Sequence, residues 1–377
     1  MVTKPPTAQE AALHYPLADA LPEPGRTLEL APGVRWLRMP LPFALDHINL
    51  WLLRDQQDGI EGWTIVDCGV ANDTTRALWD QIFEHELQGL PVLRVVVTHM
   101  HPDHIGLASW LTERWGTAER DCRLWISATD WNVAKVASQP TTSTATGFGG
   151  EGAARFFAMH GLTDPESLDR VRARGNYYVG MVPTVPARYK RLMDGMALTI
   201  NGRRWTCHAG YGHAPEHISL HCAELHATLG DARFSGVLIS GDMVLPRIST
   251  NVSVIDLEPE ADPLPLYLRS VAAMRHLDAA TLVLPSHGKP FLGLHERVDQ
   301  LLQHHEDRYA EVLLACAEAP QSAADLLMVL FKRKLDLHQT TFAMGESVAH
   351  LHALAGVGRL MSEKGTDGVL RFRAVAA

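Results

Sequence analysis

The segment VVVTHMHPDHIG, residues 95–106, joins an apolar run to four side chains of metal-binding type: His99, His101, Asp103 and His104. The β-branched run predicts a buried strand, and the polar residues begin where that strand is expected to end. His99 and His101 are separated by one residue on an extended chain, so both imidazoles point to the same side. Asp103 and His104 follow at the predicted start of a helix, from which their side chains can turn back. Imidazole and carboxylate ligands suit zinc and iron and leave positions open for water, so the segment predicts a catalytic metal site.

Three further candidate ligands lie at the ends of later apolar runs: His213 in GYGHAPEHISL, Asp242 in SGDMVLP and His287 in LPSHGKP. Each is flanked by glycine or proline, as expected where a strand meets a turn. A polar loop that is rich in histidine by chance is the alternative, and the recurrence of ligand types at later strand ends argues against it. With two imidazoles for each ion and additional carboxylates, these residues would hold two ions bridged by Asp242 and a hydroxide.

Together these residues resemble the motifs of the metallo-β-lactamase superfamily. The resemblance extends over about residues 30–295 and rests, in chain order, on Asp67, His99, His101, Asp103, His104, His213, Asp242 and His287. It implies an α/β fold, a four-layer αββα sandwich with the site at one edge. The expected strand runs, VRWLRM, HINLWLLRD, WTIVDCG and RLWIS before residue 130 and ALTINGRRWTCHAG, HISLHCAEL, GVLISGDMV and ATLVLPSHG after residue 195, are consistent with two sheets.

The resemblance also implies which residue serves which ion. The first ion would be held by His99, His101 and His213, and the second by Asp103, His104 and His287. Asp242 would bridge the two ions, and Asp67 would lie behind the ligands and orient one of them or the nearby backbone. The two ions are expected to be zinc, with iron and manganese as alternatives, because these ions share the same ligand types.

Differences from related enzymes narrow the expected chemistry. Zinc β-lactamases commonly have a cysteine where this chain has Asp242, and flavo-diiron oxygen reductases have a glutamate where it has His101. A dinuclear hydrolase remains. Two divalent ions lower the pKa of a shared water from about 16 toward neutrality, and the resulting hydroxide would attack a carbonyl carbon or a phosphorus. Asp103 could also pass a proton to the leaving group, so Asp103 and Asp67 are the candidate catalytic carboxylates.

The substrate remains open between two kinds of electrophile. GYGHAPEHISL resembles a motif of glyoxalase II and its acyl-thioester relatives, which implies a thioester or ester of acyl-CoA or glutathione type. The region from PLYLRSVAAMRHL to the C-terminus resembles β-lactamase-like protein 2, a single-strand endoribonuclease, but the net charge of −9 disfavours RNA binding, which depends on basic residues. A third hypothesis, a metal domain that senses a ligand and a DNA-binding tail, is weakened by the few cations of FAMGESVAHLHALAGVGRL.

A basic segment is the best internal indication of an anionic small-molecule substrate. Arginine and lysine alternate with tyrosine here, and the residues that could clamp or stack on a substrate are Arg170, Arg172, Arg174, Tyr177, Tyr178, Arg188, Tyr189, Lys190 and Arg191. A solvated helix face with core tyrosines is the alternative interpretation. Arg247 and Asn251, in the polar loop after Asp242, are further candidates for substrate contact. His217, which begins a predicted strand, is expected to face the core.

Three parts of the chain follow from these patterns. Residues 1–30 are rich in proline and predict a lead-in, and residues 31–295 predict the catalytic domain, with an insertion at about 132–194. Residues 296–377 predict a winged-helix-like C-terminal domain: a long amphipathic helix from about residue 296, a second after Ser322, a third over about 342–362, and a hairpin that turns at Asp367-Gly368.

The composition limits the compartment and the partners. Five cysteines without a CxxC spacing indicate reduced thiols, and the N-terminus lacks the apolar core of a signal peptide, so we expect a cytoplasmic protein. No run of about 18 apolar residues indicates a membrane span. We therefore expect no membrane partner, and nucleic acid only if the enzyme is the endoribonuclease; a homodimer is left open.

Overall fold

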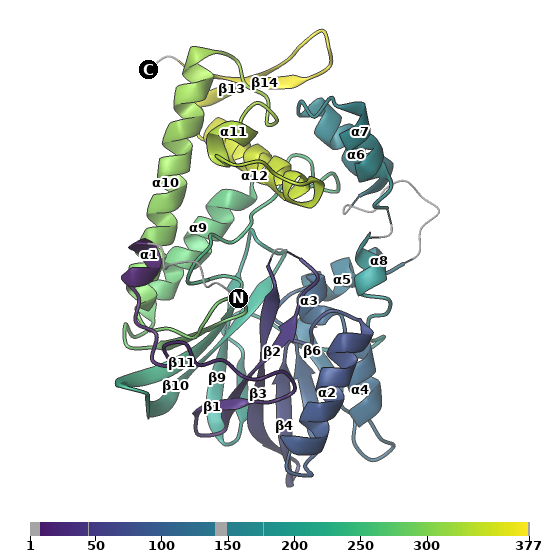
Figure 1. The fold of residues 1–377 in the computed structure, drawn as a ribbon, viewed down its shortest axis with the longest axis vertical. Coiled ribbons are helices and arrows are strands. Elements are labelled where there is room, and N and C mark those ends of the chain that lie inside the picture. The colour runs from purple at the N-terminus through teal and green to yellow at the C-terminus, as the bar shows by residue number, and fades with distance from the viewer. Residues whose placement is uncertain (1–7, 44, 140–148, 176, 376–377) are drawn as a thin grey trace.

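Two β-sheets lie face to face in the lower half of the view in Figure 1. The computed structural model describes residues 8–43, 45–139, 149–175 and 177–375. The larger sheet contains, in order, β1 (Leu28–Ala31), β2 (Val34–Pro40), β3 (His47–Gln57), β4 (Ile60–Val66), β5 (Val92–Val96), β6 (Arg123–Ser127) and β7 (Tyr189–Leu192). The smaller sheet contains β12 (Leu282–Pro285), β11 (Ala232–Gly241), β10 (His217–Leu229), β9 (Arg203–Gly210) and β8 (Ala197–Ile200).

Strand direction explains where the polar segments meet. Strands β4, β5, β6 and β7 pair in parallel, and so do β11 and β12. Asp67 follows β4, His99 follows β5 by a few residues, Asp242 follows β11 directly, and His287 follows β12. Since parallel strands end at the same edge of a sheet, these residues gather at the carboxyl ends, where α/β folds bind ligands.

Side chains on alternating positions of the strands build three apolar layers. On β2, Val34 and Trp36 point into the layer between the sheets, whereas Leu37 and Met39 point into the outer layer. Trp36 stacks on Trp51 of β3 in the inner layer, with ring centroids 6.5 Å apart.

Helices cover both outer faces, which gives the expected αββα sandwich (Figure 1). The larger sheet is covered by α2 (Asp73–His85), α3 (Pro102–Ile105), α4 (Ala108–Trp115), α5 (Ala128–Ala137) and α8 (Tyr177–Met181). The smaller sheet is covered by α9 (Pro263–Ala273), the 3-10 turn η1 (Met274–His276) and α10 (Leu294–Glu318).

The C-terminal region adds α11 (Leu327–Leu330), α12 (Leu337–Gly356) and a hairpin of β13 (Leu360–Lys364) and β14 (Leu370–Ala374). The hairpin turn at Asp367-Gly368 is as expected, with Gly368 at φ +81°. The third helix differs from the expected 342–362. It begins earlier because Asp336 and Gln339 form a reciprocal cap, and it ends earlier because residues 360–364 pair as a strand. The second helix is only one turn long, after a Ser322–Asp325 hydrogen-bonded turn.

The segment expected to be an insertion, 132–194, contributes to several layers. Its last residues, Tyr189–Leu192, form β7 and pair in parallel with β6, so they belong to the larger sheet. Earlier in the segment, α6 (Gly150–Met159) and α7 (Pro165–Arg172) pack against α12 and the apolar core of the C-terminal region. The part 140–148 and residue 176 lie outside the described residues. None of the described helices is both long and apolar enough to cross a bilayer.

Candidate metal centre

Two groups of ligand atoms lie side by side at the carboxyl ends of the strands. The first consists of His99, His101, His213 and Asp242, and the second of Asp103, His104 and His287; within each group the ligand atoms lie within 4.8 Å of one another. All seven predicted ligands are therefore brought together. The larger sheet supplies the segment after β5, and the smaller sheet supplies the loop between β9 and β10 and the residues after β11 and β12.

The first group places three imidazole nitrogens at one point. The Nε2 atom of His99 lies 2.9 Å from Nδ1 of His101 and 3.2 Å from Nε2 of His213. His213 donates its Nδ1–H to the carbonyl oxygen of Asn251 at 2.7 Å, so its Nε2 carries a lone pair. Lone pairs that converge at this distance repel unless a cation lies between them, and this geometry fits a divalent metal ion.

The histidines of the second group, like His213, each donate Nδ1–H to an oxygen on the side of the ring away from the site. His104 donates Nδ1–H to Oδ2 of Asp67 at 2.8 Å, and His287 donates Nδ1–H to the carbonyl of His47 at 2.8 Å. Their Nε2 atoms both face Asp103 Oδ2, at 3.7 Å for His104 and 3.4 Å for His287. The buried Nε2 of His104 has no hydrogen-bond partner among the described residues, as expected of a ligand atom without its cation.

Asp242 divides its two oxygens between the groups. Its Oδ2 lies 3.3 Å from His213 Nε2 in the first group. Its Oδ1 lies 3.6 Å from His104 Nε2 and 3.5 Å from His287 Nε2 in the second group. Oδ1 is buried without a hydrogen-bond partner in the described part of the chain. A carboxylate in this position could serve both groups, so the predicted bridging role of Asp242 is geometrically possible.

The electrostatics of the two groups differ. Burial, followed by the neighbouring imidazoles, lowers the pKa of His101 to about 3 and that of His99 well below its usual range, so these two rings are neutral near pH 7. In the second group, burial lowers the pKa of His287 but Asp242 and Asp103 outweigh it and raise this pKa to about 10. The carboxylates of Asp103 and Asp242 thus make the surroundings of the second group negative, and a divalent cation there would balance this charge.

Asp67 is the buried carboxylate behind the ligands. Its Oδ1 accepts the Thr98 N–H at 2.8 Å, and its Oδ2 accepts from His104 at 2.8 Å and from the Thr98 hydroxyl at 2.9 Å. Its backbone has φ +62°, a conformation that costs a non-glycine residue about 1–2 kcal/mol. The surrounding hydrogen bonds maintain this conformation, and they fix the tautomer of His104 that leaves Nε2 free for a metal.

Three supporting residues were not predicted from the sequence. Asp130 accepts the N–H of Met100 at 2.8 Å and that of Glu216 at 2.7 Å, and thereby ties the two histidine-bearing loops together. In the sequence, the only local pattern around Asp130 is that of a helix start, in which the Ser127 side chain accepts from the Asp130 N–H. Asn49 donates to the carbonyls of Pro285 and Gly288, so it holds the loop that carries His287. His47 accepts from the Gly288 N–H at 2.9 Å.

His217, expected to face the core, is fully buried beside the site. Its ring lies 4.9 Å from that of His99, and its Nε2 accepts the backbone N–H of Asp242 at 3.1 Å. Because Nε2 accepts, the proton is on Nδ1 and the ring is neutral, which agrees with a pKa lowered by burial. His217 therefore positions Asp242 rather than binding an ion.

A cavity of about 670 Å³ opens onto the ligands. Its apolar lining includes Leu41, Phe43, Phe156, Phe157, Val171, Leu335 and Phe342. Arg174 and Arg333 are the only arginine or lysine side chains that line it within the described ranges. The carboxylates that line it are Asp103, Asp242, Asp256, Glu258, Asp262 and Glu346. The cavity is thus mainly apolar, and its charged lining is more acidic than basic.

The candidate substrate residues are divided between this cavity and the outer surface. Tyr177, Tyr178 and Asn251 line the cavity, whereas Arg188, Tyr189, Lys190 and Arg247 are not among its lining residues. The hydroxyl of Tyr178 donates to the carbonyl of Met100, and it is therefore engaged in holding the ligand loop.

Of the basic segment, Arg174, Tyr177 and Tyr178 line the cavity, and Arg170, Arg172, Arg188, Tyr189, Lys190 and Arg191 do not. Tyr189 stacks on Trp131, and Lys190 lies over the ring of Trp125. Arg247, in the loop after Asp242, pairs with Glu10. Arg170 and Arg172 on α7 pair with acidic residues of α6 and α7 and lie on the exposed surface. These contacts fit the alternative interpretation of a solvated helix face with packed tyrosines.

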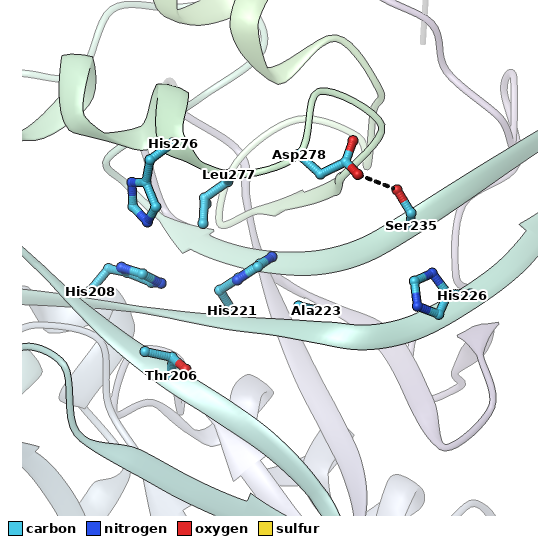
Figure 2. Close-up of a pocket in the computed structure, with 9 residues that line it drawn as sticks. All are labelled: Thr206, His208, His221, Ala223, His226, Ser235, His276, Leu277 and Asp278. Carbon is cyan, nitrogen blue, oxygen red and sulfur yellow. Dashed lines mark hydrogen bonds between the residues drawn. The ribbon is translucent and has the colours of Figure 1, made fainter.

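A smaller cavity of about 320 Å³ lies beside β9, β10 and η1, and Figure 2 shows its residues. His208 faces His221 and His276, with ring centroids 5.8 Å and 5.2 Å away. Burial lowers the pKa of His221 to about 4, so that ring is neutral near pH 7. Among the described residues only the two groups above bring three ligand atoms within 4.8 Å, and these histidines belong to neither.

Comparisons with known proteins agree with this geometry. A profile of the metallo-beta-lactamase superfamily matches residues 44–287, and a profile described as "Metallo-beta-lactamase-like, C-terminal domain" matches residues 309–375. A curated relative, the "Probable metallo-hydrolase YqjP" of Bacillus subtilis (strain 168), is 24% identical over 328 residues, which are 84% of this chain and 91% of the relative.

Two crystal structures are similar along nearly the whole chain. A beta-lactamase domain protein from Burkholderia ambifaria is 52% identical, with a TM-score of 0.88, over 98% of this chain and 100% of that chain. A metallo-beta-lactamase family protein from Thermus thermophilus is 26% identical, with a TM-score of 0.70, over 92% of this chain and 100% of that chain. The similarity therefore includes the C-terminal region as well as the sandwich.

Proposed function

The chain belongs to the metallo-β-lactamase superfamily, and we propose that it is a metal-dependent hydrolase that cleaves a thioester or ester bond of a small molecule. The observation that carries this proposal is the carboxylate of Asp242, which turns one oxygen to each group of ligands at the base of the large cavity. The name of the Bacillus subtilis relative, a probable metallo-hydrolase, supports the metal-dependent hydrolase part of this proposal.

The ligand set suits two zinc ions, with iron or manganese as alternatives. When bound, such ions supply a water molecule that ionises near neutral pH and positive charge that stabilises a developing oxyanion. The residues of the chain have separate tasks. Asp67 and the Asn251 carbonyl fix the tautomers of His104 and His213. Asp103 lies at the cavity and can hold a proton for the leaving group.

The cavity supports an acyl compound over a nucleic acid. An apolar lining gains free energy when it buries an acyl or aryl group, about 25 cal/mol for each Å² removed from water. A single-stranded RNA would need several cations along its path, because phosphate contacts dominate its affinity. The large cavity offers Arg174 and Arg333 against six carboxylates, so the endoribonuclease remains the weaker alternative. An anionic part of the substrate, as in CoA or glutathione, would lie near these two arginines.

One set of assays tests this proposal. The metal-loaded protein is offered an acyl-CoA, the same acyl group on glutathione and on neutral N-acetylcysteamine, a matched oxygen ester, and single-stranded RNA. We expect turnover of the thioesters or esters, and its loss in Asp242→Ala. Cleavage of RNA that is lost in the same variant, without ester or thioester turnover, would reverse the assignment.

The arginines are tested with the same substrates. Arg333→Ala is expected to raise KM for the anionic thioesters while leaving KM for the neutral one nearly unchanged, because only the anionic substrates use the guanidinium. Arg188→Ala is the matched control, since Arg188 is exposed and is not a lining residue of the cavity. An equal rise of KM for charged and neutral substrates in Arg333→Ala would contradict the expected charge contact.

A further inference from the structure

The loop that follows Asp242 is held by the C-terminal helices. The buried Arg297 of α10 donates from Nε to the carbonyl of Leu245 at 2.6 Å and from Nη2 to that of Ile248 at 3.0 Å. The backbone N–H of Val254 donates to the carbonyl of Gly345 on α12 at 3.1 Å. Both ends of the loop are thus fixed by residues beyond the β-sandwich.

The contact between this loop and α12 is unusually close at Gly345. A Cβ atom at this position would lie 2.7 Å from the side chain of Ser253 and 3.1 Å from the carbonyl oxygen of Val254. Side chains do not normally approach within 3 Å, so glycine is required for the helix to come this near. The neighbouring residue, Glu346, can therefore extend its short side chain directly to the loop.

One continuous path of hydrogen bonds leads from Glu346 to a metal ligand. Oε2 of Glu346 accepts from Nδ2 of Asn251 at 3.2 Å, and the Asn251 carbonyl accepts Nδ1–H of His213 at 2.7 Å. The side-chain oxygen of Asn251 accepts in turn from the Ser253 hydroxyl at 2.7 Å. Both ends of the Asn251 side-chain amide are therefore hydrogen-bonded, and its backbone carbonyl is kept in place to accept from the ring of His213.

We propose that Glu346 is a positioning residue for His213, which acts through Asn251, and that the C-terminal region thereby sets the affinity of the first ligand group for its metal ion. The proposal deepens the function proposed above and rests on the same metal site. Groups that orient a metal-binding histidine typically change metal affinity by about 10–100-fold. Because Glu346 acts one residue further away, we expect an effect at the lower end of this range.

The test measures metal binding without any substrate, so it is independent of whether the protein is a thioesterase. Metal-free protein is titrated with zinc against a competing chelator, and the cobalt-loaded protein is characterised by its visible absorption spectrum. We expect Glu346→Ala to weaken one of the two binding steps by about tenfold and to alter the cobalt spectrum. Glu346→Gln should remain close to the unmodified protein, because its amide oxygen can still accept from Asn251.

Two further variants test the path itself. Asn251→Ala keeps the backbone carbonyl but removes the link to Glu346, so it should reproduce the loss in Glu346→Ala, and the double variant should be no weaker than either single one. Ser347→Ala is the matched control on α12, because its buried hydroxyl has no hydrogen-bond partner among the described residues. It should leave both binding steps unchanged.

Several results would overturn the proposal. Unchanged affinity and an unchanged cobalt spectrum in folded Glu346→Ala would do so, as would losses that multiply in the double variant. If Glu346→Ala does not fold, Asn251→Ala decides alone, since it removes the same hydrogen bond from the other side. A failure of Glu346→Gln to restore binding would show that packing or charge, and not the hydrogen bond, is what matters.

Discussion

The replacement Asp67→Asn tests whether a hydrogen bond behind the ligands controls one of the two ions. Asp67 differs from asparagine only at the Oδ2 position, which in the structure accepts Nδ1–H of His104 at 2.8 Å. An amide nitrogen there donates and cannot accept, so His104 would move its proton from Nδ1 to Nε2. That proton would then point at Asp103 and Asp242, 3.7 Å and 3.6 Å away, where a metal ion is expected.

The magnitude follows from the bond that is lost. A hydrogen bond to a charged group contributes about 1.5–3 kcal/mol, and each 1.4 kcal/mol corresponds to a factor of about ten in an equilibrium constant. The second ion should therefore bind about 10–100-fold more weakly, while the first ion is nearly unaffected. The Oδ1 contact with the Thr98 N–H at 2.8 Å is retained, so the protein is expected to fold.

The assay is a count of bound metal over a series of zinc concentrations, combined with a thermal melt of the metal-free variant. The weaker binding of the second ion should appear as one step shifted to about 10–100-fold higher zinc concentration than in the parent protein, with the other step unchanged. Asp73→Asn, an exposed carboxylate at the start of α2, is the control and should change neither step. Two unchanged binding steps in a folded Asp67→Asn protein would refute the tautomer argument.

Three other changes have expected outcomes. Gly345→Ala should displace the loop at Ser253 and lower metal affinity without unfolding the sandwich, as seen by chelator competition and by retained circular dichroism. Burial raises the pKa of Glu346 from 4.5 to about 7, so the folded state holds its proton more tightly. The unfolding free energy of the parent should thus fall relative to that of Glu346→Gln as pH rises from about 4.5 to about 7. The measurement is the denaturant midpoint of both proteins at about pH 5 and at about pH 8. A difference between the two proteins that is the same at both pH values would contradict this expectation. Trp36→Ala should lower the free energy of unfolding by about 3–5 kcal/mol in urea denaturation, because the ring is fully buried between the sheets.

The metal ligands could be predicted because their signals are local. His99 to His104 stand within one short segment, and Asp242 and His287 follow apolar runs that are readable as strands. Of the residues that support the ligands, Asp67 was predicted, but Asn49, Asp130 and Glu346 give no such signal. Glu346 meets Asn251 across 95 positions of sequence, and Asn49 meets Pro285 across 236. Contacts of this kind depend on how the sheets and helices pack, which periodicity does not describe.

The basic segment shows a different limit of sequence reasoning. Its arginines stand out against an acidic chain, but Arg170 and Arg172 on α7 are neutralised by Glu166, Asp169 and Glu151. The pairing i to i+4 between Glu166 and Arg170 is readable once a helix is assumed, whereas the pairing with α6 is not. Similarly, β7 is only four residues long and lies at an edge, so its place in the sheet depends on β6 as a neighbour.

The ligands of each proposed ion come from both halves of the sequence, and bound ions would therefore cross-link the fold. The first group joins His99 and His101 to His213 and Asp242, and the second joins His104 to His287. Each group needs side chains from both sheets, so a metal ion would bind the packed sandwich more tightly than the unfolded chain. Each ion should then add about 2.7 kcal/mol of stability at a hundredfold excess over its dissociation constant. Loss of metal from this edge would consequently weaken the packing of the two sheets against each other and lower the free energy of unfolding, even without substrate.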